Sequence, residues 1–359
     1  MKLAWKELKY NWKKFFLVEI IVILMMFMVL FLSGLVKGLG SAVSSGIDNM
    51  QVENFVLSDD AEKLLTISKL TRDEFDSVEH EYGDRATSLD VQRMYIQKNK
   101  NSEKLDITYF AIDPTSFLNP EVYKGVKLST DDYTIVLDDD FEGRGIKVGD
   151  SVVDSNTGVK LTVVGFTNNA MYGHVSVGYI STTTYTDIMK SLNPMYEIHI
   201  HAVALQGAVD HKIDGAKIYS KEEIIESIPG YKAEQMTISM VEWLLVVITA
   251  VIIGIFFFVI NLQKEKEFGV LKALGMGMRH IVRIILSQVF IIAVSGALLS
   301  VILVSLMSAV LPATMPFTLV GSQVFLVLVT FVLISILGSL ATVIRVAHVD
   351  PAQIIGGDL

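Results

Sequence analysis

The sequence predicts an α-helical membrane protein with four transmembrane helices, one before and three after a large α+β domain. Four apolar runs lie at 15–36, 241–262, 281–311 and 323–344. Each is long enough to cross a hydrocarbon core of about 30 Å. A long polar and mixed stretch, 37–240, separates the first run from the second. Lys and Arg also gather in alternate connections, as they do in multi-pass membrane proteins.

The first apolar run is interpreted as a retained span rather than a cleaved signal peptide. It follows a basic, amphipathic segment, 1–14, with lysines at positions 2, 6, 9, 13 and 14. The run is longer than the core of a signal peptide, and no small-residue cleavage site follows it cleanly. The next sequence, SGLVKGLGSAVSSGIDNM, is rich in small residues and predicts that the helix continues past the membrane as a stalk.

The distribution of basic residues predicts the orientation. The segment 1–14 and the connection after the second run are both basic, and the tail 345–359 begins with Arg345, whereas the connection 312–322 carries no charge. Basic loops stay on the cytoplasmic side. We therefore expect a multi-pass protein of the cell membrane, with both termini in the cytoplasm and the 37–240 domain outside.

The 37–240 stretch mixes strand and helix signals and predicts an α+β domain whose strand order the sequence leaves open. Turn residues in DSNTG predict a hairpin over 145–167, and Thr71 with Glu74 predicts a capping box at the start of a helix. By the same patterns, strands are predicted at 52–58, 92–98, 104–113, 133–139 and 195–205, and helices at 71–82, 181–192 and 220–230.

Residues 263–280, QKEKEFGVLKALGMGMRH, predict a short amphipathic helix on the cytoplasmic side. Apolar positions recur at intervals of three and four residues, and the glycines of Gly275-Met276-Gly277 predict the helix end. Such a helix can rest on lipid or dock on a partner. Because it is short and already held by a span at each end, docking on a cytoplasmic partner is the favoured interpretation.

Composition and missing motifs exclude several function classes. The net charge is −9, and the acids of the 37–240 domain, such as those at 59–60, 131–132 and 138–140, are interpreted as a solvated surface. The chain has no cysteine, EF-hand loop, P-loop or H-E-x-x-H motif. We therefore expect no enzyme, no metal site and no nucleic-acid partner.

A few side chains remain as binding candidates. His199 and His201 alternate along a predicted strand, which favours an ordinary strand face over a metal site. Tyr172 and His174 share a glycine-flanked loop, where either an ordinary turn or a pair of haem ligands is conceivable. Tyr231 precedes the second apolar run and is either an interfacial anchor or a wall for a flat amphiphilic ligand.

The segment 263–288, QKEKEFGVLKALGMGMRHIVRIILSQ, resembles the sequence that follows the second span in FtsX-like, MacB-type ABC transporter permeases. The tail RVAHVDPAQIIGGDL, 345–359, resembles the closing helix of that family, and the hairpin at 145–167 resembles its outer core domain. The family's layout is one span, then an outer domain, then three further spans. The resemblance therefore covers the whole chain.

The resemblance implies a permease subunit that has no ATP site of its own. Two copies would pair with two cytoplasmic ATPase subunits, which bind ATP and Mg²⁺, and the 263–280 segment would be the coupling helix. The residues expected to dock on the ATPase are Glu267, Phe268, Leu271, Lys272, Leu274 and Gly275.

Within the family, the N-terminal sequence resembles haem-exporting permeases of Gram-positive bacteria, above all in LFLSGLVKGL at the end of the first span. This implies that haem is a transported substrate, taken laterally from the outer lipid leaflet, with no permanently bound cofactor. The expected contacts are Tyr231 first, then Tyr172 and His174, then Lys37, Lys232, Met240 and Glu242. The same fold leaves two alternatives open: an FtsX-like transmitter that activates an extracellular partner, and an exporter of peptides, lipids or antibiotics.

Overall fold

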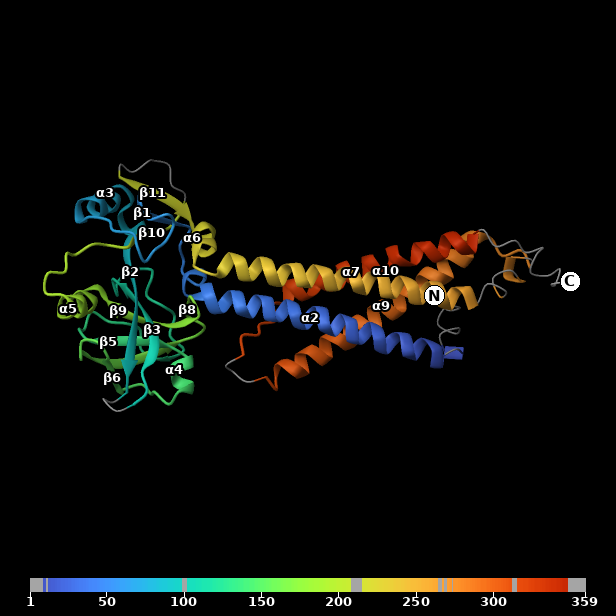
Figure 1. Cartoon of the computed structure of the whole chain (residues 1–359), viewed down its shortest axis with the longest axis horizontal. Helices are drawn as coiled ribbons and strands as arrows, with labels where there is room; N and C mark the ends of the chain where they lie inside the picture. Colours follow the sequence, from blue (N-terminus) through green and yellow to red (C-terminus); the bar gives the residue numbers. More distant parts are fainter. Residues whose placement is uncertain are drawn as a thin grey trace. The chain divides into compact units, whose positions relative to one another are not determined.

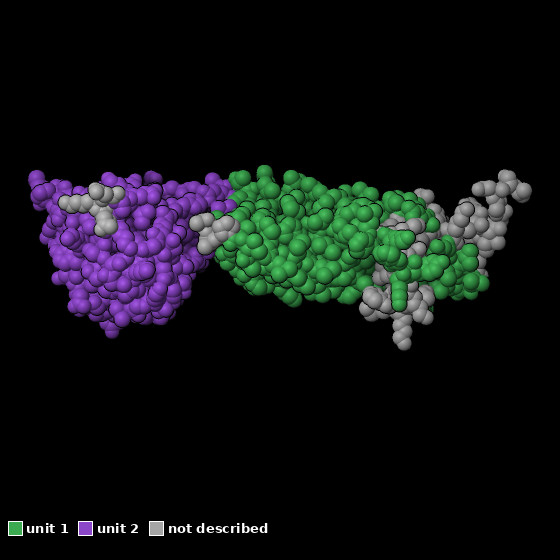
Figure 2. All heavy atoms as spheres, turned by 90° about the horizontal axis from the view of Figure 1, so that it is seen from below, with its two compact units in different colours: residues 1–38, 236–359 green, residues 39–235 purple. Residues whose placement is uncertain are grey.

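The computed structural model describes residues 9–10, 12–98, 102–207, 215–263, 267, 270–272, 274–311 and 315–347. The chain divides into two compact units, coloured separately in Figure 2. Residues 1–38 and 236–359 form the first, here called the membrane unit, and residues 39–235 form the second, here called the inserted domain.

Four helices in the described part of the chain are long and apolar enough to cross a membrane. They belong to α2 (Trp12–Asp48), α7 (Tyr231–Gln263), α9 (Met278–Ser308) and α10 (Gly321–Ala347), which Figure 1 labels. The fold class with four apolar helices and a large α+β domain after the first is therefore confirmed. α2 continues past residue 36, as predicted for a stalk, and α7 begins at Tyr231, ahead of the predicted start at 241.

The membrane unit has an apolar core in which α2 packs against α9. Buried side chains recur every three or four residues on each helix, so each presents one apolar face. Gly296 of α9 lies in this contact, where a Cβ would lie 2.5 Å from Val22 Cγ1. The buried residues are Phe15, Val18, Val22, Met26 and Leu30 of α2, Val289, Ile292, Ala293, Ala297 and Val304 of α9, and Phe331 of α10.

Gly34 and Gly38 form a G-x-x-x-G pair on α2 that the chain's own loop covers. A Cβ at Gly38 would lie 2.1 Å from the carbonyl oxygen of Pro316, and one at Gly34 would lie 2.5 Å from the ring of Phe317. The Thr318 N–H donates to the Gly34 carbonyl over 3.0 Å. Such a pair commonly joins two transmembrane helices. Here the loop ahead of α10 occupies it instead.

The predicted helix end between the second and third spans is confirmed. Gly275 has φ +87°. The Met276 N–H donates to the Leu271 carbonyl, and the Gly275 N–H donates to the Lys272 carbonyl, each over 3.0 Å. This pair of bonds is a Schellman motif, which requires a left-handed residue that glycine adopts without strain. α9 begins shortly afterwards, at Met278.

The described part of the inserted domain contains a sheet whose pairing closes on itself. The path β11-β1-β10-β2-β3-β9-β5-β7-β4 is joined by β6, which pairs with both β2 and β7, and β8 pairs with β9. The strands are β1 (Asn54–Ser58), β2 (Ala86–Gln97), β3 (Leu105–Ile112), β4 (Lys124–Gly125), β5 (Thr134–Asp138), β6 (Ser151–Asp154), β7 (Lys160–Thr167), β8 (Met171–Tyr172), β9 (Val175–Ser181), β10 (Ala202–Leu205) and β11 (Ala216–Ser220).

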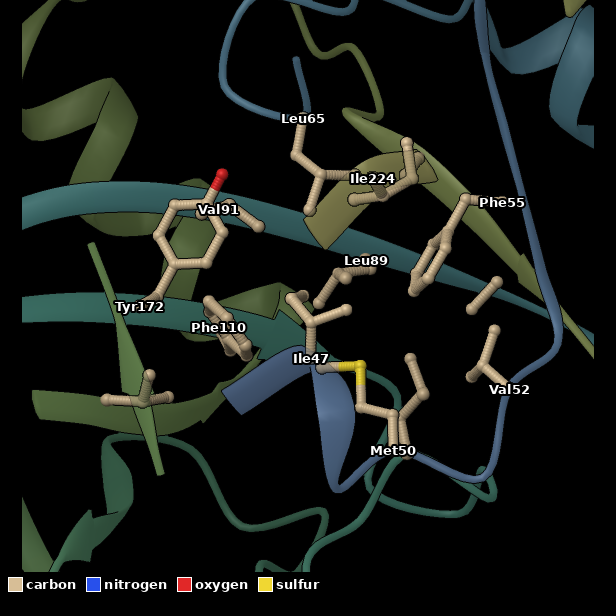
Figure 3. Packing of buried hydrophobic residues seen from close by; sticks show 14 of the residues in the cluster. Ile47, Met50, Val52, Phe55, Leu65, Leu89, Val91, Phe110, Tyr172 and Ile224 are labelled. Carbon is tan, nitrogen blue, oxygen red and sulfur yellow. The ribbon is translucent and has the colours of Figure 1, made fainter. Parts of the chain in front are cut away.

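Closure of the sheet separates two apolar cores. β2 and β3 pair antiparallel from Leu89↔Ile112 to Ile96↔Leu105, and alternate side chains point to opposite faces. Ile107 and Tyr109 lie in one core, and Phe110 and Ile112 in the other. Figure 3 shows the second core, where Ile47 at the end of α2 lies among the side chains of the sheet.

The short helices have the predicted caps. α3 (Arg72–Tyr82) starts with the Thr71–Glu74 capping box, and α5 (Thr182–Leu192) is capped by the Ser181 side chain. α6 (Lys221–Ser227) starts at a second capping box, formed by Ser220 and Glu223. The remaining helical turns are η1 (Gly83–Arg85) and α4 (Asp140–Gly143).

The predicted strand over 195–205 is partly wrong. β10 begins only at Ala202, so His199 and His201 do not alternate along a strand. Ile200 makes an isolated bridge to Leu70, and the His201 backbone N–H donates to Asp90 Oδ1 over 2.9 Å. At His201 the backbone N–H thus bonds the buried Asp90 carboxylate instead of a carbonyl oxygen of a neighbouring strand, although the sequence pattern predicted regular strand pairing there. By contrast, the hairpin of β6 and β7 is confirmed.

Candidate substrate site and coupling segment

A cavity of about 190 Å³ opens in the membrane unit between α2, α7 and α10. Its walls are mostly apolar, and Glu242 is the one ionisable residue among the described residues that line it. The carboxylate is half-buried and lies within hydrogen-bonding reach of the Ser33 hydroxyl. The other lining residues are Val29, Trp243, Val246, Thr249, Leu326, Val327, Thr330, Phe331, Ile334 and Ser335.

Three polar residues in this wall, Thr249, Thr330 and Ser335, were not predicted from the sequence. Thr249 Oγ1 donates to the Leu245 carbonyl over 2.7 Å, and Ser335 Oγ donates to the Phe331 carbonyl over 2.8 Å. Both hydroxyls therefore bond their own helix and keep an acceptor lone pair. The spacing of Glu242, Val246 and Thr249 at i, i+4 and i+7 places all three on one helix face. From that spacing, the sequence could have predicted that Thr249 shares a helix face with Glu242.

Met240 and Lys37 also belong to the membrane unit, but neither lines the cavity. Met240 is 68% exposed, and Lys37 is partly exposed on α2. The structure thus brings Glu242 alone, of the predicted contacts in this unit, to the cavity wall.

In the inserted domain, Tyr172, His174 and Tyr231 converge on one turn of α2. The Gly173 N–H donates to the Val43 carbonyl over 2.8 Å, and the His174 N–H donates to the Ala42 carbonyl over 3.0 Å. The Tyr231 phenol lies within hydrogen-bonding reach of Ser44. The β8–β9 loop and the start of α7 are therefore fixed to the same turn.

His174 stands out in this group because its backbone is in the left-handed region, with φ +63°. Its side chain is 46% exposed, and Nε2 lies 3.2 Å from Glu234 Oε1. A non-glycine residue in this conformation is uncommon and is found at turns and at binding sites. The contact ties the β8–β9 loop to α7, and Glu234 is a partner that the sequence did not predict.

Tyr172 lies in the core rather than at the surface. It is 9% exposed, and its ring meets Phe110 edge-to-face with centroids 5.7 Å apart (Figure 3). Burial raises the pKa of its phenol to about 12. In this position Tyr172 supports the loop that carries His174. Lys232 is exposed, with Nζ 3.9 Å from Glu226 Oε2.

Asp138 lies beside the connection between β7 and β8, and its burial contradicts the prediction that it belongs to a solvated acidic surface. It is only 1% exposed. Its Oδ2 accepts from the Ala170 N–H over 2.6 Å, and its Oδ1 accepts from the Asp140 N–H over 3.2 Å. Burial raises the pKa of this carboxyl to about 7. The acid therefore orders the β7–β8 connection from inside the domain.

The 263–280 segment, predicted to be the coupling helix, exposes some of its described apolar residues and buries others. Leu274 is 79% exposed and Val270 is 48% exposed. Leu271 instead packs against Ile281 and Ile285 of α9. Glu267 and Gly275 are exposed and Lys272 is partly exposed, whereas the predicted contact Phe268 lies outside the described residues, as does most of the 345–359 tail.

Comparison with known proteins identifies relatives of both units. Residues 239–351 match the family model described as FtsX-like permease C-terminal. The chain is 29% identical, over 99% of both chains, to a Staphylococcus haemolyticus (strain JCSC1435) protein with the provisional name hemin transport system permease protein HrtB. It is 28% identical, again over 99% of both chains, to the protein of the same provisional name from Staphylococcus epidermidis (strain ATCC 12228).

Among solved structures, the extracellular domain of the ABC-type transporter YknZ from Gram-positive bacteria is 15% identical. The match covers 43% of this chain and 82% of that chain, with a TM-score of 0.30. Residues 239–351 are therefore similar to the C-terminal part of FtsX-like permeases, and the chain is similar along almost its entire length to bacterial proteins named as permeases.

Proposed function

We propose that this chain is the permease subunit of an ATP-driven efflux pump that exports haem, taken laterally from the outer leaflet of the cell membrane. The observation that carries the proposal is the similarity along 99% of both chains to a protein named for hemin transport. The FtsX-like permease domain supports a membrane permease whose ATP hydrolysis occurs on a separate cytoplasmic ATPase.

The chemistry of the cavity in the membrane unit supports a flat, mostly apolar substrate. Haem has an apolar ring, two carboxylates at one edge and an iron that accepts oxygen, nitrogen and sulfur ligands. The walls at Trp243 and Phe331 offer apolar contact, and Glu242 offers an oxygen ligand. Separately from this cavity, in the inserted domain, Tyr231 at the start of α7 offers a phenol, and Lys232 offers a charge for a propionate.

A second copy of the chain is part of the proposal. Only 6% of the apolar window of α7 is buried, and Met236, Met240, Trp243 and Leu244 are exposed on it. A cavity of about 190 Å³ is also smaller than the roughly 300–1,000 Å³ of typical ligand sites. A second α7 across the opening would complete the wall, and lipid would cover the remaining apolar faces.

The proposal is tested by titrating haemin into the purified chain, in complex with its ATPase, and following the Soret band. We expect a saturable shift in the parent. Tyr231→Phe and Glu242→Gln should each weaken binding about tenfold, the effect of losing about 1.4 kcal/mol. The matched control is Tyr123→Phe, which removes the phenol of an exposed tyrosine elsewhere in the inserted domain.

Two results would contradict the proposal at different levels. A parent protein without any saturable Soret shift would exclude haem as the substrate. If both variants show a normal Soret shift at parental affinity, haem remains the substrate, but neither Tyr231 nor Glu242 is a contact for it.

A further inference from the structure

The inserted domain contains a cavity of about 810 Å³ that the proposed transport function does not use. It lies between α3, β2, α5 and the segment 193–201 that precedes β10. Its volume falls within the roughly 300–1,000 Å³ of small-molecule sites. All of its lining residues belong to the inserted domain, which packs as one compact unit.

The described lining of this cavity is strongly acidic. Arg72 is the only Lys or Arg in it, and Arg72 Nε already lies 2.9 Å from Asp76 Oδ1. Because clefts lined by one sign of charge concentrate ions of the other sign, this cavity favours cations. The lining acids are Glu79, Asp84, Asp90, Asp113 and Asp187.

A buried phenol in the cavity wall makes no well-formed hydrogen bond, although the Tyr196 hydroxyl lies within reach of it. Tyr185 is 2% exposed, and its hydroxyl makes no hydrogen bond of acceptable geometry. The Tyr196 hydroxyl lies close enough to affect its ionisation but is also without a well-formed bond. Burial raises the pKa of Tyr185, so the phenol stays neutral. An unsatisfied buried hydroxyl costs on the order of 1–3 kcal/mol, a cost that a ligand would offset.

The two histidines beside the cavity are each held by a partner within the domain. His201 Nδ1 lies 3.0 Å from Asp90 Oδ1, and His199 Nδ1 lies 2.9 Å from the Glu197 carbonyl oxygen. Both Nδ1 atoms therefore have partners within the domain. Among the described residues, no group of three His, Cys, Asp or Glu side chains is placed to hold a metal ion.

Aromatic rings complete the lining. Phe75, Phe117, Tyr185 and Tyr196 all contribute to the wall. The Arg72 guanidinium lies over the Phe75 ring, with Cζ 5.0 Å from its centroid, so a planar cation already packs on this wall. Carboxylates around aromatic faces are the combination that binds ammonium and guanidinium groups.

We infer that the cavity between α3, β2, α5 and residues 193–201 binds an organic cation: an ammonium, amidinium or guanidinium group on an apolar stem. The cation would face the acids of the wall, its stem would pack on the aromatic rings, and the Tyr185 hydroxyl would gain a hydrogen-bond partner. The ligand is either a free small amine or a basic side chain of a peptide, since both present this chemistry.

The test is calorimetric titration of the full-length chain in detergent with benzamidine, a flat aromatic cation, and with benzamide, its neutral isostere. We expect saturable binding of benzamidine alone, weakened by salt. Asp187→Asn should reduce its affinity about tenfold. The control Asp106→Asn, which removes an acid on β3 outside the cavity, should leave the affinity unchanged.

Triarginine amide distinguishes the two ligand sources. If it competes with benzamidine, the ligand is a basic side chain of a peptide. If it does not compete, the ligand is a free small cation. Tyr185→Phe provides an independent check. It should weaken benzamidine binding and leave the melting temperature equal or higher, because the removed hydroxyl makes no well-formed hydrogen bond within the domain. Equal binding of benzamide, no saturable binding of benzamidine, or an unchanged affinity in Asp187→Asn would each overturn the inference.

Discussion

At the scale of single residues, burial changes the meaning of side chains that look ordinary in the sequence. Asp138 belongs to a run of three acids, which is typical of a solvated surface, yet it lies inside the inserted domain and holds the β7–β8 connection through Ala170. Tyr172 looks like a ligand but supports the core, whereas His174, two residues later, is exposed beside Glu234. Tyr172 is buried and His174 is exposed, and this difference in burial decides the roles of these two residues.

Asp138→Asn should make the inserted domain less sensitive to pH. The folded-state pKa, about 7, lies above the ordinary value of 3.8. The contribution of Asp138 to stability is therefore fully present below pH 4 and is lost by about 1.4 kcal/mol per pH unit up to about pH 7. The melting temperature of the variant relative to the parent should thus be higher at pH 8 than at pH 5.

The control for this measurement is Asp106→Asn, which removes an exposed acid of the same domain. If the melting temperatures of Asp138→Asn and the parent differ by the same amount at pH 5 and pH 8, Asp138 is ionised at both pH values, which contradicts the prediction. The Asn side chain offers one acceptor oxygen in place of two. That loss lowers the melting temperature of the variant by the same amount at both pH values.

At the scale of elements, glycines decide which surfaces can touch. The G-x-x-x-G pair of α2 is filled by the loop at Pro316 and Phe317, so this face of α2 is not free for another helix. α7 and α10 approach each other at a second glycine pair, where a Cβ at Gly254 would lie 3.4 Å from the Gly338 carbonyl oxygen. Close helix packing through small residues is the usual solution inside a membrane.

Gly38→Ala should destabilise the membrane unit, because the new methyl group would lie 2.1 Å from a backbone oxygen that cannot rotate away. Overpacking of this kind costs about 1–3 kcal/mol, and thermal unfolding of the chain in detergent measures it. Gly321→Ala is the matched control, because nothing lies within 4 Å of the added carbon at the start of α10. Equal melting temperatures for the two variants would mean that the loop at Pro316 and Phe317 moves aside without a loss of stability.

At the scale of the whole molecule, the proposed pump requires a separate ATPase, and we expect that ATPase to dock at the turn before α9. The Schellman motif holds this turn rigidly, and Leu271 anchors it on α9. Val270 and Leu274 are left exposed one helical turn apart. A rigid turn with an exposed apolar pair can transmit force from a bound ATPase to the spans.

Leu274→Asp should abolish copurification of the ATPase while leaving the melting temperature of the permease unchanged. Leu271→Asp should instead lower the melting temperature, because it places a charge against Ile281 and Ile285. This contrast separates docking from folding. Normal assembly of the ATPase with Leu274→Asp would rule out Leu274 as part of the docking surface.

Much of the fold could be predicted because its signals are local. The apolar runs, the Thr71–Glu74 box and the DSNTG hairpin each depend on residues a few positions apart. The strand at 195–205 was overextended because Asp90, distant in the sequence, takes the backbone bond at His201. The candidate site was predicted only in part, since the grouping of Glu242 with Ser335 requires α7 and α10 to pack together.

The sequence by itself determined the four apolar spans, their order around an α+β domain, and the helix end at Gly275, because length, hydropathy and backbone freedom act locally. The tertiary structure alone decided the closed strand order, the burial of Asp138 and Tyr172, the covering of Gly34 and Gly38, and the acidic cavity around Tyr185. Each of these depends on which distant segments meet, and contacts between distant segments leave no periodic signal in the chain.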